Sequence, residues 1–237
     1  MSDFVILFER LAQQALAPLL IALVASAAVV ALFRNWRITL PALIVQYVAV
    51  GILLARVIQP GIALVKPLVG IIVCVTLSIA AQRADNERAE HGEQTASQRI
   101  EDVNWRSVPA QLLLRAVAVL LVLVVAFGAT VRFPLPGSAR ELALGAYILV
   151  VCGLFIAATA PEGLNIGTGI LMMLSGFELG YMPLEPSISV SVLIGLTTLV
   201  VAVAIAYFTL ADADALRDAL HIASVYALEQ GETDEED

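Results

Sequence analysis

Apolar residues occur in seven long runs along this 237-residue chain. Each run is about 17–25 residues long, which is enough for an α-helix to cross a hydrocarbon core of roughly 30 Å. None of the runs shows the alternation of apolar and polar residues that is typical of strands in a membrane barrel. The sequence therefore predicts an all-α, polytopic membrane protein with about seven transmembrane helices, near residues 15–33, 38–55, 61–81, 110–131, 141–160, 163–182 and 187–210.

The composition of the chain supports the same class of protein. Hydrophobic residues make up 60% of the chain and charged residues 14%, whereas about 25% of residues are charged in an ordinary soluble domain. The mean hydropathy is +0.91. The chain begins MSDFVILFER, which lacks the basic region of a cleavable signal peptide, so we expect the first span to remain in the mature protein.

Arginine residues predict the orientation, because connections rich in Lys and Arg stay on the cytoplasmic side. In a seven-span topology, two connections lie on the same side as the C-terminus. These two connections carry the larger number of arginines, namely Arg34, Arg37, Arg83, Arg88, Arg99 and Arg106. The opposite side receives Arg10, Arg56, Arg132 and Arg140. We therefore predict an N-terminus outside, a cytoplasmic C-terminus and a bacterial plasma membrane, since no feature marks an organelle.

Two parts of the chain are expected in the cytoplasm. Residues 1–210 are expected to form the transmembrane domain. Its one long connection, residues 82–109, has too few apolar residues for a core of its own, so we expect a short surface helix or a mobile segment there. Residues 211–237 are predicted to form an amphipathic helix followed by an acidic tail, with an apolar stripe at Leu216, Leu220, Ala223 and Ala227. The net charge of −8 argues against nucleic acid as a partner.

Two charged side chains lie deepest in the predicted spans, Lys66 in the third and Glu178 in the sixth. A charge at membrane depth costs roughly 2.5–3.5 kcal/mol on insertion scales, so it requires a partner, a water-filled cavity or a function. The alternating topology places both at similar depth near the outer side, which predicts contact between them. The alternatives are that Lys66 snorkels to the interface and that Glu178 reaches water at the end of its helix.

Pro67 directly follows Lys66 and removes a backbone donor, so the local hydrogen bonding is expected to loosen there. Gln46 and Tyr47 are polar groups of the second span, and such residues more often bind a neighbouring helix than a substrate. We retain Gln46 as a weaker candidate for an ion pathway. In the sixth span, the spacings of Gly163 with Gly167 and Gly176 with Gly180 predict close helix packing.

Motifs of soluble enzymes are missing from the sequence. It contains no GxxxxGK[ST], no GxGxxG after a strand, no HExxH and no Ser/His/Asp set, so we expect no catalytic residue and no chemistry by this chain alone. Cys74 and Cys152 lie within apolar spans and resemble buried hydrophobic residues. His91 and His221 belong to no ligand pattern, so no metal and no cofactor are expected.

Two stretches, ALVKPLVGIIVCVTLSIAAQR and GLFIAATAPEGLNIGTGILMMLSGFELGYM, resemble the hydrogenase-4 component E family. The resemblance implies a seven-helix membrane subunit whose C-terminal part is similar to the K subunit of complex I. It also implies an intramembrane lysine in the third helix and a basic residue at its cytoplasmic end, which Lys66 and Arg83 match. The family's glutamate lies at about the place of Leu174, one helical turn from Glu178, and its arginine-asparagine pair is replaced by Pro161 and Glu162.

The resemblance predicts a subunit of a complex I-like or group 4 hydrogenase-like energy-converting assembly. The chain would contribute to proton or sodium translocation, or seal that pathway, through Lys66, Glu178 and Gln46, while redox chemistry occurs in other membrane subunits of an oxidoreductase complex. One alternative is a structural or assembly subunit without a transport role. Another is a small independent transporter, although no inverted repeat is evident.

Overall fold

The computed structural model describes residues 16–33, 35–90, 110–135 and 140–234. These residues form α-helices and no strand, which confirms the predicted all-α class. The helices are α2 (Leu16–Leu32), α3 (Trp36–Leu54), α4 (Pro60–Ala63), α5 (Val65–Glu90), α6 (Ala110–Arg132), α7 (Arg140–Thr159), α8 (Gly163–Tyr181) and α9 (Ile188–Asp234).

Five segments of the described chain are long and apolar enough to cross a membrane. They are Trp36–Leu54, Gly61–Asn86, Leu113–Arg132, Arg140–Thr159 and Ile188–Asp212. The apolar helix Pro18–Leu32 is shorter. Helix α8, which contains Asn165, Thr168, Ser175 and Glu178, is not among the five. The protein is therefore membrane-embedded, and the count of seven spans stays a prediction.

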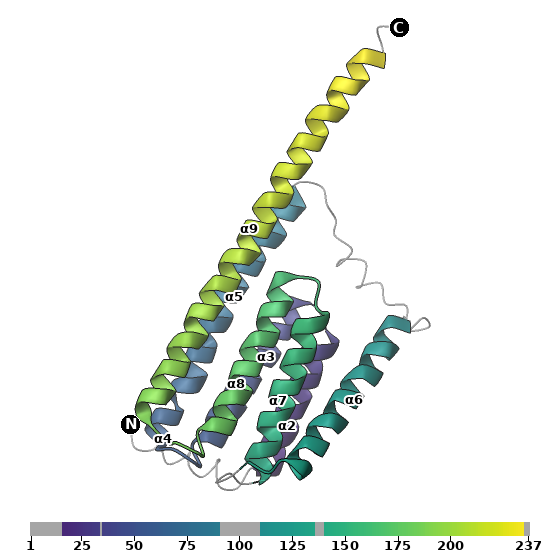
Figure 1. The fold of residues 1–237 in the computed structure, drawn as a ribbon. Coiled ribbons are helices and arrows are strands. Elements are labelled where there is room, and N and C mark those ends of the chain that lie inside the picture. The colour runs from purple at the N-terminus through teal and green to yellow at the C-terminus, as the bar shows by residue number, and fades with distance from the viewer. Residues whose placement is uncertain (1–15, 34, 91–109, 136–139, 235–237) are drawn as a thin grey trace.

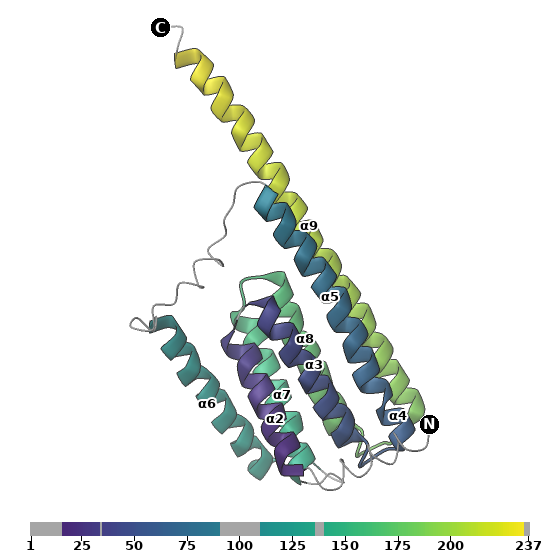
Figure 2. The same ribbon diagram turned by 180° about the vertical axis from the view of Figure 1, so that it is seen from behind.

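The helices form a bundle with a long helical pair along one side (Figure 1). In the bundle α2 packs on α3 and α7, and α7 packs on α8. Helix α6 packs mainly on α7. Helices α5 and α9 lie side by side and contact the bundle through α3 and α8, as the view from behind also shows (Figure 2). The end of α2, the start of α3, the end of α5 and the end of α9 all lie toward the same side of the molecule (Figure 1).

Helices α5 and α9 both continue past the predicted ends of their spans. Helix α5 runs to Glu90, where we expected a loop from residue 82, and α9 runs unbroken through residue 210 to Asp234. Neither extension contains a Gly or Pro that would end a helix before residue 231. The two helices support each other where Ala80 and Ala81 pack in one cluster with Ala206. Residues 91–109 of the predicted loop and 235–237 of the acidic tail lie outside the described residues.

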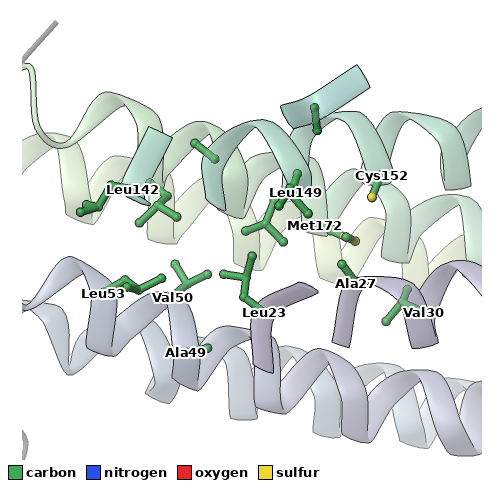
Figure 3. Close-up of a cluster of buried hydrophobic side chains, with 14 of the residues drawn as sticks. Leu23, Ala27, Val30, Ala49, Val50, Leu53, Leu142, Leu149, Cys152 and Met172 are labelled. Carbon is green, nitrogen blue, oxygen red and sulfur yellow. The ribbon is translucent and has the colours of Figure 1, made fainter. Parts of the chain in front are cut away.

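A hydrophobic core fills the space between α2, α3, α7 and α8. Figure 3 shows the side chains of α2 and α3 facing those of α7 and α8 across this core. Leu23, Val50, Leu149 and Met172 are completely buried there. Burial of this kind fixes how α8 sits against the other three helices, and so sets the position of its polar residues.

Close backbone contact joins α7 to α8. A Cβ atom at Gly153 would lie 2.6 Å from the carbonyl oxygen of Gly169, and one at Gly176 would lie 2.7 Å from Leu149 Cβ. Of the glycines singled out in the sixth span, Gly176 and Gly167 each face a neighbouring helix at such short range, and Gly163 faces open space. Small residues thus let α8 approach its neighbours within the chain itself.

Candidate functional site

Lys66 lies in the first turn of α5, directly after a break in the helix. Helix α4 ends at Ala63, Leu64 forms a turn, and α5 begins at Val65. The missing N–H of Pro67 costs little here, because N–H groups in the first turn of a helix have no intrahelical partner. The expected disturbance around Pro67 is therefore a helix break, which places Lys66 at the start of the new helix.

Glu178 lies near the end of α8, and its side chain meets Lys66. The Lys66 ammonium donates a hydrogen bond to Glu178 Oε2, and each of the two side chains is only 3% exposed. This confirms the predicted contact. The two alternatives, snorkelling of Lys66 and access of Glu178 to water, are wrong for this structure, because both side chains are enclosed by protein.

The ion pair has no other buried charged side chain near it in the described part of the bundle. Among the side chains that the structure describes, Lys66 and Glu178 are the only charged residues that are buried. The opposite charges cancel, which offsets part of the cost of removing each from water. An ammonium and a carboxylate in direct contact can also exchange a proton, giving a neutral amine and a carboxylic acid. The arrangement is therefore suited to holding or passing one proton.

Tyr47 is the second partner of the lysine. The Lys66 Nζ lies 5.0 Å from the centroid of the Tyr47 ring, within the range of about 6 Å for a cation–π contact. Tyr47 is 1% exposed. From the sequence, Tyr47 is recognisable only as a polar residue of the second span. The sequence feature that could have identified Tyr47 is Gly70, one helical turn after Lys66, because a glycine leaves room for a large ring from a neighbouring helix.

Gln46, the weaker candidate, is buried but does not join the ion pair. Its side chain is completely buried, and neither its amide nitrogen nor its amide oxygen has a hydrogen-bond partner among the described residues. The Tyr47 hydroxyl also lacks a partner with hydrogen-bond geometry, although Ser175 lies close to it. The structure thus brings Lys66 and Glu178 together and leaves Gln46 without a polar contact.

A cavity lies at the end of the molecule where α5 begins and α8 ends. Its volume is about 230 Å³, and it lies between the loop that precedes α5 and the loop that follows α8. It is lined by Val57, Ile58, Gln59, Ile62, Pro186, Ser187 and Ile188. Lys66 lies in the first turn of α5, after the first of these loops, and Glu178 lies in the last turn of α8, before the second.

Metal-binding clusters are not found in the described part of the chain. No group of three or more His, Cys, Asp and Glu residues there could hold a metal ion. Cys74 and Cys152 are free and buried, and the Cys74 thiol points to the carbonyl oxygen of Leu40. We found no match between this chain and a protein-family model, a curated protein or a solved structure.

Proposed function

We propose that this chain is an integral membrane subunit of a complex I-like or group 4 hydrogenase-like energy-converting assembly. In this proposal it helps to translocate protons or sodium ions, or to seal their pathway, and partner subunits perform the redox chemistry. The proposal is supported by one observation above all, the buried ion pair of Lys66 and Glu178 in a membrane-embedded bundle. Ionisable residues at membrane depth are expensive, and they mark ion and proton pathways in many transport proteins.

The proposed topology has seven spans, formed by α2, α3, α5, α6, α7, α8 and α9, with the N-terminus outside and the C-terminus in the cytoplasm of a bacterium. The distribution of arginines supports it. The start of α3 and the end of α5 lie on the side of the long α9 extension (Figure 1). In the sequence, the two connections that adjoin these helix ends carry six arginines, and the opposite side carries four. Fusions test this orientation. A fluorescent protein fused to the C-terminus should fluoresce, and alkaline phosphatase fused there should be inactive.

Purification from native membranes tests the proposed assembly. The tagged chain, extracted in mild detergent, should carry iron–sulfur subunits and antiporter-like membrane subunits in fixed ratio, as identified by mass spectrometry. In vesicles that contain this assembly, Lys66→Met and Glu178→Gln should each reduce ion uptake driven by electron transfer. Glu185→Gln is the matched control, because Glu185 is exposed at the same end of α8. Unchanged ion uptake in both Lys66→Met and Glu178→Gln would contradict the transport role.

An assembly role is the second candidate function, and the long α9 favours it. The helix continues to Asp234, beyond its apolar segment Ile188–Asp212, so about 22 residues, or roughly 33 Å of helix, extend past that segment. Such an extension offers a binding site for soluble subunits. Removal of residues 213–237 should then lose partner subunits, whereas neutralising Lys66 and Glu178 should leave both assembly and ion uptake unchanged.

The remaining candidate function, a small independent transporter, predicts a different experimental result. The purified chain, reconstituted alone in liposomes, would have to carry ions by itself. A chain that purifies alone as a monomer or homo-oligomer and moves protons or sodium in liposomes would replace the proposed assembly.

A further inference from the structure

The Lys66 ammonium contacts groups from two other helices. Glu178 from α8 supplies a carboxylate, and Tyr47 from α3 supplies the face of its ring at 5.0 Å. All three side chains are almost completely buried. A cation over an aromatic face is stabilised more strongly when it is removed from water. The positive charge therefore has two stabilising contacts, of which only one depends on the charge of Glu178.

The position of Tyr47 is fixed by the contact between α3 and α5. A Cβ atom at Gly70 would lie 2.4 Å from Tyr47 Cγ, so the ring packs directly on the backbone of α5. One turn away, a Cβ atom at Gly51 would lie 2.7 Å from Pro67 Cδ. Residues 47 and 51 of α3 thus pack on residues 70 and 67 of α5. This packing of α3 on α5 holds the Tyr47 ring beside Lys66, and it does not depend on a hydrogen bond from the tyrosine hydroxyl.

The ring of Tyr47, rather than its hydroxyl, is the part that contacts the lysine. The hydroxyl is buried without a partner of hydrogen-bond geometry, so it adds no bond that would hold Tyr47 in place. The titratable groups close to Tyr47 in the described chain are Lys66 and Cys74 of α5 and Glu178 of α8. Of these, only Glu178 can change the charge opposite the ammonium.

We propose that Tyr47 is a positioning residue whose ring keeps the Lys66 ammonium in the site when Glu178 takes up a proton. Proton uptake converts the carboxylate to a neutral acid and removes the ion pair, and the ammonium then retains its contact with the ring. As a step in ion transfer this inference rests on the proposed function, but the contact itself is testable without any transport. In the assembly, Tyr47 would allow Glu178 to gain and lose a proton without displacement of Lys66.

Lys66 is the only lysine of the chain, which allows a direct test. Growth on ¹³C-labelled lysine gives the full-length chain, purified through a lysine-free tag, a single set of lysine side-chain NMR signals. In the unaltered protein the Hε signals should be shifted upfield by the ring current of Tyr47. Glu178→Gln mimics the protonated acid, and there the upfield shift should persist. Tyr47→Phe should retain the shift, and Tyr47→Leu should abolish it.

The result that would overturn the inference is a loss of the upfield shift in Glu178→Gln, because the lysine would then leave the ring once the carboxylate is neutral. Absence of the shift from the unaltered protein would overturn it as well.

If Tyr47→Leu does not fold, a series of variants takes its place. In this series residue 47 is a phenylalanine that carries zero to three ring fluorines. Fluorination weakens the negative face of the ring while nearly preserving its volume.

The thermal midpoint should fall with each added fluorine, by about 4 °C over the series. In a background of Lys66→Met with Glu178→Gln, the same series should be flat. A flat series in both backgrounds, or an equal fall in both, would overturn the inference.

Ion uptake by the native assembly is measured separately. A lysine that stays on the ring in an assembly that moves no ions would contradict the proposed function and leave the positioning role of Tyr47 intact.

Discussion

Lys66 and Glu178 lie 112 residues apart in the sequence and form a buried ion pair between α5 and α8. Removing Lys66 leaves the Glu178 carboxylate buried without its counter-ion, and removing the carboxylate leaves the Lys66 ammonium with the Tyr47 ring alone. We expect Lys66→Met and Glu178→Gln each to lower the free energy of unfolding, by about 3–5 kcal/mol for a fully uncompensated charge. The double variant should recover much of that loss, because no charge remains. Denaturant titration in mixed micelles would measure all three.

The exposed carboxylate of Glu185 provides the control for this cycle. Glu185→Gln should change the free energy of unfolding by less than about 0.5 kcal/mol. Strictly additive losses in the Lys66 and Glu178 variants would show that the two side chains are not coupled, which would contradict the ion pair.

Gly70→Ala should displace the Tyr47 ring. The new Cβ atom would lie 2.4 Å from Tyr47 Cγ, and the ring is buried on its other sides. A loss of about 1–3 kcal/mol in unfolding free energy is expected for such overpacking. Gly128→Ala in α6 is the matched control, since nothing lies within 4 Å of its Cβ position, and it should be neutral or stabilising by up to about 1 kcal/mol. Equal effects at residues 70 and 128 would refute the close contact.

Gly169→Ala should be more damaging than Gly70→Ala. Its Cβ atom would lie 2.7 Å from the backbone of Ala157 and Gly153, and backbone atoms cannot turn away as a side chain can. The expected result is separation of α7 from α8 and a lower thermal midpoint. Gly163→Ala, on the same helix but facing open space, should leave the midpoint nearly unchanged. A fully stable Gly169→Ala protein would mean that the two helices are further apart.

Gln46→Leu separates a structural role from a transport role. The buried amide has no hydrogen-bond partner among the described residues, and an unpaired buried polar group costs about 1–3 kcal/mol. Replacement by leucine should therefore leave the thermal midpoint unchanged or raise it. If Gln46 also belongs to the ion pathway, ion uptake by the assembly should fall while stability does not. A clear loss of stability would indicate that the amide has a partner in the folded protein.

Much of the fold could be predicted because apolar run length alone identifies membrane helices. The contact of Lys66 with Glu178 could also be predicted, since two opposite charges at similar depth have few other ways to avoid lipid. The residue of α3 that contacts Lys66 could not be predicted in the same way. Gln46 and Tyr47 are neighbours in sequence, and apolar residues all around the helix hide which of them faces α5. Only the packing of Tyr47 on Gly70 decides it.

A helix was predicted after residue 210, but its continuity with the last span and the full length of α5 were missed for a related reason. Hydropathy shows which part of a helix lies in the membrane but not where the helix ends, and residues 82–90 contain no Gly or Pro that would end α5 earlier. The end of α5 is also held by a long-range contact, in which the Trp36 indole N–H donates a 2.8 Å hydrogen bond to Asp85. Trp36 and Asp85 are 49 residues apart, so local sequence patterns carry no information about their contact.

Burial of the single lysine gives this protein an unusual chemical property. Apart from the α-amino group, Lys66 is the only amine that an acylating reagent could modify, and it is enclosed between α3, α5 and α8. Acylation of residue 66 therefore requires those helices to separate. The rate of that single modification, read by mass spectrometry, would report how often the bundle opens at this site under working conditions.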